Sequence, residues 1–470
     1  MALLNTVSGQ KPRQIALRIL QRALSPVSGS GAGVPPVSAG RRALGPPPRQ
    51  RPPLQPPRAG EFIEDRLDSA LARWHLAPPD RRLCQELVYG VVRWRATLDW
   101  LIARKTQNRS QPPRLQNLLR LGLYQIFWLD RIPYHAAVNE TVALARDSGL
   151  VSRSGFVNAV LRGYLRELDP TRQLLAELKS AQPGLGYSHP EWLAVRWQQR
   201  WGPEKAAQLM AWNNTPPKTF ARLNTLKTDP SKLLAQWRRE RVEFEPVHHA
   251  WIEDKMVFEL NSHPPLTTLP SFQQGQFYVQ DPSTLLAVRS LHPQPGQTIL
   301  DLCAAPGGKL TYIAQLMQNH GNVIAHDVTP DRLKLIQENC ARLGVTCAET
   351  VFPSTLNSQL STLFDRILID APCSNTGVLR RRVDLRWRIR PEELTRLSAL
   401  QLQLMHQAAP LLKPGGVLVY STCSLEPEEN EEVAREFLTT HGDFKLLQSH
   451  QLLPFVDGTD GVYVAQIKRV

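Results

Sequence analysis

Residues 298–309 read TILDLCAAPGGK, an apolar run that ends in Asp301 and leads at once into a turn of small residues. The next segment, LTYIAQLM at 310–317, has apolar side chains at helical spacing, and NVIAHD at 322–327 is again a short apolar run. Strand, turn, helix and strand in this order predict a βαβ unit. Units of this kind build a doubly wound parallel sheet.

Further strands and helices of the same kind follow along the chain. Residues 330–344, PDRLKLIQENCARLG, have the spacing and the initial proline of a helix. RILIDAP at 366–372 and VLVYSTC at 417–423 are nearly continuous apolar runs, as expected of strands covered on both faces. VYVAQIKRV at 462–470 is predicted to close the sheet. We therefore expect an α/β, Rossmann-like domain over residues 291–470.

The amino-terminal part of the chain has the pattern of an all-α bundle. Apolar residues recur at helical spacing in 14–24 and in successive amphipathic segments up to residue 170, one of which predicts a continuous helix over 80–104. We expect a helical domain over 10–175. The pattern resembles a NusB-type RNA-binding domain, and the resemblance rests on RLCQELVYGVVRW (82–94), IPYHAAVNETVALA (132–145) and FVNAVLRG (156–163).

Residues 28–58 interrupt this bundle with a different composition. Nine of the chain's 39 prolines occur there among Gly, Ser and Arg, with almost no apolar side chain. Such a composition predicts disorder and a tolerated loop insertion, while its arginines leave an RNA-binding arm as the alternative. Farther along, residues 185–290 mix short strand patterns with helices and predict a small α+β module.

The totals indicate a basic, multidomain protein. A length of 470 residues suggests about three domains. The chain has 56 Lys and Arg against 42 Asp and Glu, and its net charge of +14 favours a polyanionic partner such as RNA. Six cysteines without a CxxC pair argue against a disulfide framework and against a bound metal. The sequence has neither a leader pattern nor a long apolar run, so we expect a cytoplasmic protein that does not enter membranes. A monomer is the default expectation.

The turn after residue 301 has the features of a nucleoside-binding loop. Gly307 and Gly308 let the backbone approach a ligand closely, and the following helix offers unpaired amides. The next strand ends in Asp327, a carboxylate that can accept hydrogen bonds from ribose hydroxyls. A dinucleotide-binding oxidoreductase is the alternative, but the turn lacks the third glycine and the later motifs are rich in cysteine.

Two cysteines directly follow predicted strands, Cys373 in IDAPCSNTG and Cys423 in VYSTCSLEPEENE. The carboxyl ends of parallel strands line the ligand crevice of doubly wound folds. A thiolate that adds to carbon 6 of cytosine activates carbon 5 for methylation, and an acid such as Asp370 can hydrogen-bond the ring. We expect polar neighbours to lower the thiol pKa. These residues by themselves leave open which cysteine attacks.

DLCAAPGGK, DAPCSNTG and YSTCS followed by EPEEN resemble the motifs of the NOL/NOP/Sun family of RNA 5-methylcytosine methyltransferases. The resemblance implies S-adenosylmethionine as cofactor, Cys423 as nucleophile and Cys373 as the residue of product release. It also implies that Asp370 and Lys309 act near the base. The cofactor contacts that it implies are Cys303, Ala304, Ala305, Pro306, Gly307, Gly308, Lys309, Asp327 and Asp370.

Two stretches depart from the family pattern. The family commonly has an aspartate after the third strand, and in the matching AETVFP we assign Glu349 to that place. The loop LRRRVDLRWRIRP has Val383 where the family commonly has proline. Its basic residues predict a surface that contacts phosphate and stacks bases, with a solvated helix start as the alternative. This surface comprises Arg380, Arg381, Arg382, Arg386, Arg388 and Arg390 around Trp387.

Together these features predict an enzyme that methylates carbon 5 of a cytosine in small-subunit (16S) rRNA before the subunit is fully assembled, with the base flipped into the cleft. The rRNA substrate is implied by the NusB-type domain, which members of the family acting on this rRNA carry. A tRNA substrate and an inactive NusB-like RNA-binding factor are the alternatives. The complete set of Lys309, Asp370, Cys373 and Cys423 argues against the inactive factor.

Overall fold

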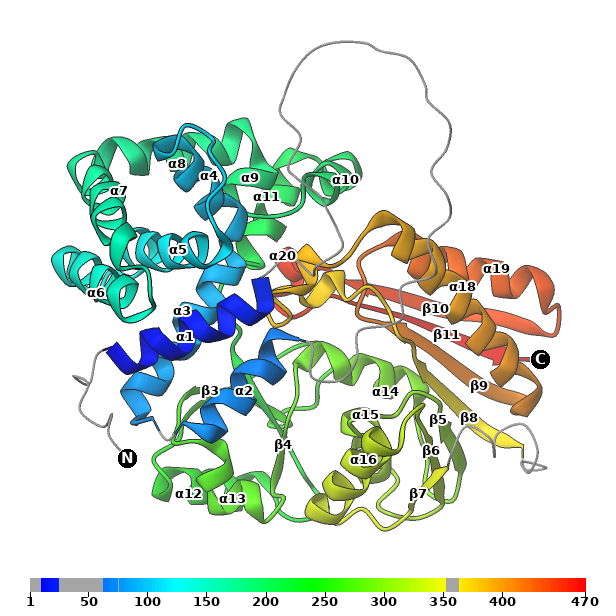
Figure 1. Cartoon of the computed structure of the whole chain (residues 1–470). Helices are drawn as coiled ribbons and strands as arrows, with labels where there is room; N and C mark the ends of the chain where they lie inside the picture. Colours follow the sequence, from blue (N-terminus) through cyan, green and yellow to red (C-terminus); the bar gives the residue numbers. More distant parts are fainter. Residues whose placement is uncertain (1–9, 25–61, 75, 352–362) are drawn as a thin grey trace, which may run out of the picture. The chain divides into compact units, whose positions relative to one another are not determined.

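The computed structural model describes residues 10–24, 62–74, 76–351 and 363–470 (Figure 1). The proline-rich segment 28–58, predicted to be disordered, lies outside the described residues. The chain divides into two compact units, Met1–Met210 and Ala211–Val470, which are described separately.

The amino-terminal unit is helical and is built around α5 (Pro113–Trp128). This helix is buried on nearly all sides and contacts α1, α3, α4, α6 and α7. Its buried amides are paired, since Asn117 Nδ2 donates to the carbonyl of Leu20 (3.3 Å) and Gln125 Oε1 accepts from Arg13 Nε (2.8 Å). The other helices are α1 (Gln10–Leu24), α2 (Ile63–Arg73), α3 (Pro78–Arg93), α4 (Arg95–Lys105), α6 (Tyr134–Asp147), α7 (Ser154–Arg166), α8 (Leu168–Ala181), α9 (Pro183–Gly186), α10 (Glu191–Trp201) and α11 (Pro203–Trp212), which crosses into the second unit.

The prediction of one continuous helix over 80–104 is wrong in one respect. The helical pattern is interrupted at Trp94, whose backbone (φ −95°, ψ 17°) separates α3 from α4. Both helices contact α5, so the break lets two short helices cover one buried helix. The apolar spacing indicates helix on both sides of Trp94, and no glycine or proline stands next to Trp94 to mark the turn.

The carboxyl-terminal unit begins with the small α+β module. Its antiparallel sheet has the order β2-β3-β1-β4. Trp237 is fully buried against this sheet, with its ring 5.3 to 5.4 Å from those of Phe244, Phe258 and Phe277. The strands are β1 (Thr219–Leu223), β2 (Glu243–Pro246), β3 (Val257–Ser262) and β4 (Phe277–Val279), and the helices are α12 (Pro230–Arg239) and α13 (Pro270–Gln273).

The rest of this unit is the Rossmann-like domain, with a seven-stranded sheet of order β10-β11-β9-β8-β5-β6-β7. The five strands from β9 to β7 are parallel, and β11 runs antiparallel between β9 and β10. The strand expected at 462–470 is therefore confirmed as the last strand in the sequence, while β10 forms the edge of the sheet. The strands are β5 (Thr298–Asp301), β6 (Asn322–His326), β7 (Ala348–Val351), β8 (Phe364–Asp370), β9 (Leu412–Thr422), β10 (Phe444–Leu452) and β11 (Val462–Arg469).

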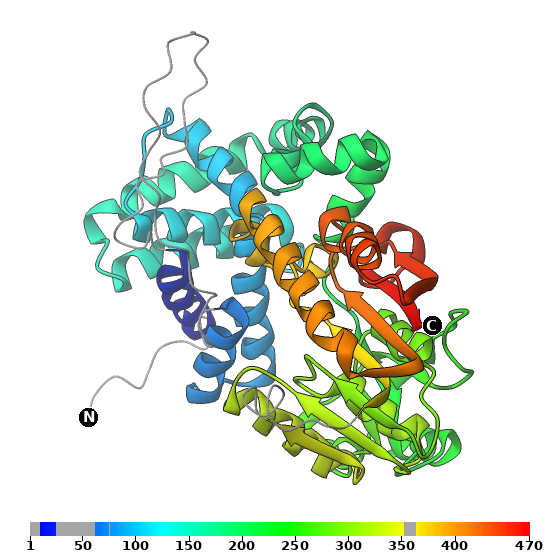
Figure 2. The same cartoon turned by 90° about the vertical axis from the view of Figure 1, so that its right-hand side faces the viewer.

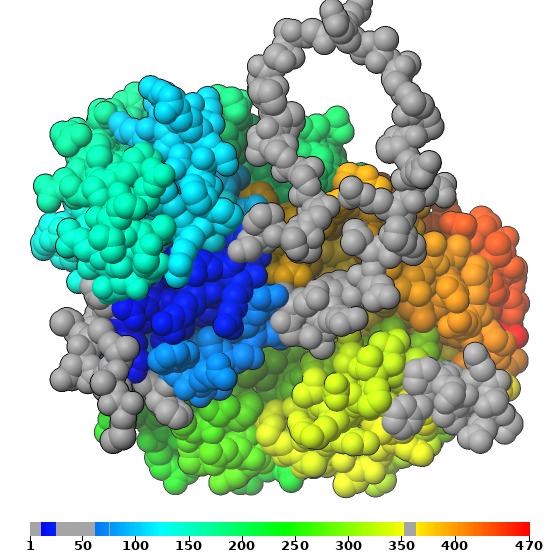
Figure 3. All heavy atoms as spheres, viewed as in Figure 1, coloured from blue at the N-terminus to red at the C-terminus, as the bar shows by residue number. Residues whose placement is uncertain are grey.

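Helices cover both faces of this sheet (Figures 1 and 2). One apolar cluster joins the sheet to α14 (Leu285–Leu291), α15 (Gly308–Leu316), α16 (Pro330–Leu343) and the α+β module. A second cluster joins it to α18 (Pro391–Ala408) and α19 (Glu431–Thr440). The outer faces of α16 and α18 are exposed, and they appear as yellow-green and orange surfaces in Figure 3. Among the described residues, no helix has the length and apolar content needed to cross a membrane.

Candidate active site

A cavity of about 420 Å³ opens at the carboxyl ends of β5, β8 and β9. The chain moves outward from β5 to β6 and β7 and then returns to β8 on the other side of β5. Ligands bind at such a reversal of strand order because the loops on either side diverge there. The end of β4 in the α+β module and the turn before β11 complete the cavity wall.

The loop between β5 and α15 forms one wall, and its two glycines are required by geometry. Gly307 has a φ of +99°, in the left-handed region. A Cβ on Gly308 would lie 2.9 Å from Cε1 of Tyr278, closer than side chains normally approach. Of the predicted cofactor contacts, those that line the cavity are Cys303, Ala304, Ala305, Pro306, Gly308, Lys309 and Asp370.

Asp301 is a cavity residue to which the sequence reading assigned no site role. Its carboxyl is fully buried, and burial together with the nearby Asp370 raises its pKa to about 8, although Lys309 acts in the opposite direction. A cation bound beside this acid would favour its ionised form, so the acid suits a cationic ligand. The positively charged S-adenosylmethionine fits this requirement. The sequence signal that could have identified Asp301 as a site residue is its position at the end of the strand before the glycine turn.

Besides Gly307 in the turn itself, two predicted cofactor contacts are not among the described lining residues of the cavity. Asp327 accepts from the backbone amides of Ala305 (2.9 Å) and Val328 (2.8 Å) and pairs with Arg332 Nε (2.7 Å), so it supports the cofactor loop from behind. Glu349 is exposed on β7. Neither is among the described residues that line the cavity, and their contacts with a cofactor stay predictions.

Lys309 and Asp370 form an ion pair in the cavity, with Nζ 2.6 Å from Oδ2. Burial lowers the pKa of Lys309, but Asp370 and, to a smaller extent, Cys423 outweigh it, so the pKa lies above its usual value. The amine is therefore a fixed cation and no proton acceptor at neutral pH. The side chain of Asp370 remains 33% exposed and can accept a hydrogen bond from a ligand.

The two cysteines lie side by side, with Sγ atoms 3.3 Å apart, but their surroundings differ. Cys423 lines the cavity and donates from Sγ to Oδ1 of Asn375 (3.0 Å). Cys373 is buried, and its hydrogen bond with Cys423 together with burial raises its pKa well above the usual value. The expectation of a lowered thiol pKa is thus wrong for Cys373, because the hydrogen bond with Cys423 and burial disfavour its thiolate.

A buried acid, Glu429, connects the two cysteine loops. It accepts from the backbone amide of Ser374 (2.8 Å), the hydroxyls of Ser374 and Ser424 (2.6 Å for the latter) and Nε2 of Gln401 (3.1 Å). The sequence reading missed both Glu429 and Asn375 as site residues. The available signals were the acid five residues after TCS and an asparagine, here at φ +60°, directly after PCS.

The basic loop after Cys373 is turned partly inward. Arg380 is 2% exposed and donates from Nε to Asp460 (3.0 Å). Arg386 is fully buried and donates to Oδ1 of Asn214 (2.8 Å) and to the carbonyl of Asn213 (2.9 Å). The prediction that these two arginines form a surface for RNA is therefore wrong, because buried oxygen acceptors hold their guanidinium groups inside the protein.

The remaining members of that predicted surface are more accessible. Arg381 and Arg382 line the cavity, and Trp387 is half-buried. Arg388 pairs with Asp384 (2.9 Å), and Arg390 is exposed. RNA contacts by Arg382 and Trp387 stay predictions, whereas Arg381 is already held by carboxylates of the protein.

Three family models match the chain. They are described as 16S rRNA methyltransferase RsmB/F (residues 288–468), NusB family (55–166) and the ferredoxin-like domain of RsmF/B-like methyltransferases (189–259). A probable ribosomal RNA small subunit methyltransferase B of Bacillus subtilis is 36% identical over 433 residues, which is 86% of this chain and 94% of the relative. The chain belongs to this methyltransferase family.

Ribosomal RNA small subunit methyltransferase B of Cronobacter sakazakii is 38% identical over 431 residues, covering 87% of this chain and 97% of its own. The crystal structure of PH0851 has the same fold over 100% of both chains, with a TM-score of 0.74 at 22% identity. The chain is thus an S-adenosylmethionine-dependent rRNA methyltransferase. Its NusB domain, ferredoxin-like module and Rossmann-like methyltransferase domain confirm the predicted fold class.

Proposed function

We propose that this rRNA methyltransferase acts on carbon 5 of a cytosine and forms a covalent bond to the base through Cys423. The observation that carries the proposal is the pair of thiols at the ends of β8 and β9, one facing the cavity and one buried behind it. Methylation of an exocyclic nitrogen or a ribose hydroxyl has no use for two adjacent thiols. Carbon 5 needs a nucleophile at carbon 6, because it is otherwise too weakly nucleophilic.

The chemistry divides among the residues of the cavity. The Cys423 thiolate adds to carbon 6, and Asp370, held by Lys309, accepts a hydrogen bond from the amino side of the ring. S-adenosylmethionine, bound along the loop from Cys303 to Lys309, supplies the methyl group. Cys373 then passes its thiol proton to the sulfur of Cys423 as that sulfur leaves carbon 6, and it takes the proton from carbon 5 while the carbon–hydrogen electron pair re-forms the double bond between carbons 5 and 6. Its raised pKa keeps Cys373 protonated, so that it can donate to the departing sulfur of Cys423.

The substrate is proposed to be small-subunit rRNA in the cytoplasm before assembly is complete, with the enzyme acting as a monomer. A base inside a duplex or under ribosomal proteins does not reach a cavity at strand ends, so the cytosine is flipped out. Family membership favours rRNA over the tRNA alternative and argues against an inactive RNA-binding factor.

Bisulfite sequencing of total RNA from cells with and without the gene tests reaction and substrate together. We expect one cytosine of small-subunit rRNA to lose its protection in the deletion strain and to regain it with the wild-type gene. Loss at a tRNA cytosine would keep the chemistry and overturn the substrate. No change at any cytosine, with labelled methyl groups still transferred to rRNA by the purified protein, would overturn the carbon 5 assignment.

A further inference from the structure

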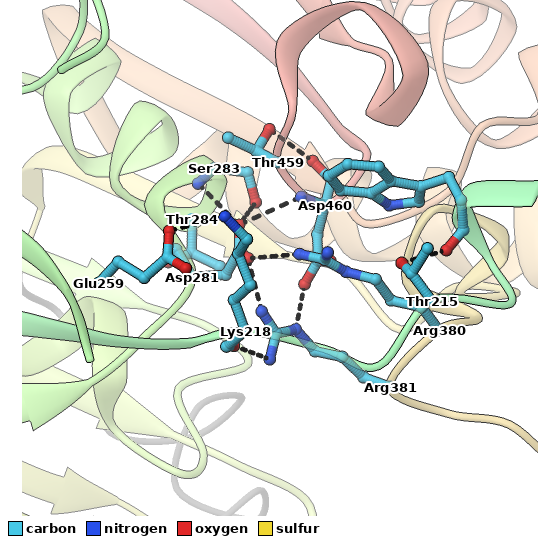
Figure 4. A network of polar contacts seen from close by, with 11 residues as sticks. Thr215, Lys218, Glu259, Asp281, Ser283, Thr284, Arg380, Arg381, Thr459 and Asp460 are labelled. Atoms are coloured by element: carbon cyan, nitrogen blue, oxygen red, sulfur yellow. Dashed lines mark hydrogen bonds and ion pairs between the residues drawn. The ribbon is translucent and has the colours of Figure 1, made fainter. Parts of the chain in front are cut away.

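Four charged side chains from three chain segments meet in the wall of the cavity (Figure 4). Arg381 donates from Nη2 to Asp281 (2.7 Å) and from Nε to Asp460 (2.5 Å). Arg380 donates from Nε to the other oxygen of Asp460 (3.0 Å). Two positive and two negative charges balance, and we call this group, Asp281, Arg380, Arg381 and Asp460, the clasp.

The clasp joins parts of the unit that are distant in sequence. Asp281 follows β4 of the ferredoxin-like module, the arginines follow the Cys373 loop, and Asp460 lies in the turn before β11. Arg381 also donates to the carbonyl of Lys218 (3.1 Å). Because a buried ion pair gains little net stability over apolar packing, its value lies more in the geometry that it enforces.

A chain of hydrogen bonds leads from the clasp to the proposed nucleophile. Next to Asp460, the amide of Gly461 donates to the carbonyl of Gly377 (2.9 Å), and the amide of Gly377 donates to the carbonyl of Cys423 (2.9 Å). A Cβ on Gly377 would lie 2.6 Å from the oxygen of Gly461 and 2.8 Å from that of Cys423, so these backbones are in direct contact. Movement of the turn at Asp460 therefore displaces the Cys423 loop.

We propose that Arg381 and Asp460 are positioning residues that hold Cys423 in place for attack on the base. This inference rests on the proposed role of Cys423. It also means that Arg381, despite its place in a basic loop beside the cavity, contributes through carboxylates of its own chain and not through RNA phosphate.

The test compares Arg381→Gln, Asp460→Asn and the double variant with Lys413→Gln. Lys413→Gln is the control. It breaks the ion pair between Lys413 and Asp365 (2.7 Å), which lies at the starts of β8 and β9, away from the cysteines. The rate of covalent complex formation is measured in single turnover with rRNA that contains 5-fluorocytidine, which cannot lose a proton from carbon 5. Calorimetry gives S-adenosylmethionine binding, and RNA affinity is measured over a range of salt concentrations.

We expect each single variant to slow adduct formation about 10- to 100-fold, since a displacement near 1 Å at a reacting group costs that much. The double variant should be no slower than the slower single variant, because the pair acts as a unit. Cofactor affinity and the salt dependence of RNA binding should match those of the control. Arg381→Lys, which keeps the charge, should fall between wild type and Arg381→Gln, and it replaces the glutamine variant if that protein melts early.

Wild-type adduct rates in these variants would overturn the inference. A slower rate explained by weaker RNA binding with a shallower salt dependence would overturn it too, because Arg381 would then contact phosphate. Absence of any adduct with the wild-type enzyme would instead refute the proposed role of Cys423.

Discussion

The loops that follow β8 and β9 both contain the dipeptide Cys–Ser, and yet they give the two cysteines different environments. Both serines bond to Glu429, which gives the two loops a common anchor. Cys423 faces the cavity, whereas Cys373 is buried and its pKa is raised. The difference comes from the position of each loop relative to the cavity, and it supports our proposal that Cys423 attacks the base and Cys373 transfers the proton.

Replacing Cys423, the cysteine that lines the cavity, has the largest expected effect. Cys423→Ala should abolish methyl transfer, because carbon 5 is then not activated. S-adenosylmethionine binding should persist, because Cys423 is not among its proposed contacts. Transfer of labelled methyl groups to rRNA and calorimetry measure the two properties. Cys347→Ala, away from the cavity, is the matched control, and methylation retained by Cys423→Ala would break the comparison.

Replacing Cys373, the buried cysteine, should block the release of product. With Cys373→Ala, addition and methylation proceed, but the proton on carbon 5 has no acceptor and the protein–RNA adduct accumulates. We expect turnover to fall about 100-fold or more. A denaturing gel detects the adduct as a shifted band that requires Cys423. Normal product release by the variant would mean that Cys373 has no part in the reaction.

Replacing Glu429, which accepts hydrogen bonds from both cysteine loops, should have a smaller effect, on the stability of the protein. Glu429→Ala leaves the buried donors of Ser374 and Ser424 without their acceptor, so the free energy of unfolding should fall by about 2–3 kcal/mol. Glu429→Gln keeps an acceptor oxygen and should cost about 1 kcal/mol. Urea unfolding measures both, with the exposed Glu432→Ala as control. Equal stability of all three variants would show that the loops hold their places independently.

The smallest expected effect concerns Asp301, at the end of the neighbouring strand β5. Its pKa of about 8 in the folded protein lies above the usual value for a carboxyl, so its proton is bound more tightly in the folded than in the unfolded state. Its contribution to stability therefore declines as pH rises from about 4 towards 8.

A cationic cofactor should lower this pKa. S-adenosylmethionine binding at pH 7 is then expected to release close to one proton, read from calorimetry in buffers of different ionisation enthalpy. Asp301→Asn should abolish the release. An unchanged proton count in that variant would assign the proton to another group.

Prediction from the sequence succeeded for the glycine turn and the two cysteines of the cavity and failed for part of the basic loop beside them. The turn CAAPGGK and the cysteines at 373 and 423 were placed at strand ends by periodicity alone, and the structure has them there. Two arginines of the loop at 380–390, Arg380 and Arg386, were wrongly predicted to lie on the surface, and Arg381 is held by carboxylates of the protein. A count of positive charges does not include acceptors from distant segments, and here Asp281, Asp460 and Asn214 provide them.

The sequence by itself determined the βαβ pattern around the glycine turn, the strands that lead to the two cysteines and the family, because these depend on local spacing and short motifs. Only the tertiary structure decided which thiol faces the cavity, that Glu429 joins both loops and that Arg380 is buried. The physical reason is that burial and hydrogen-bond partners arise from residues far apart in the chain. Asp281 and Asp460 are separated by nearly the whole methyltransferase domain, yet they bind the same arginine.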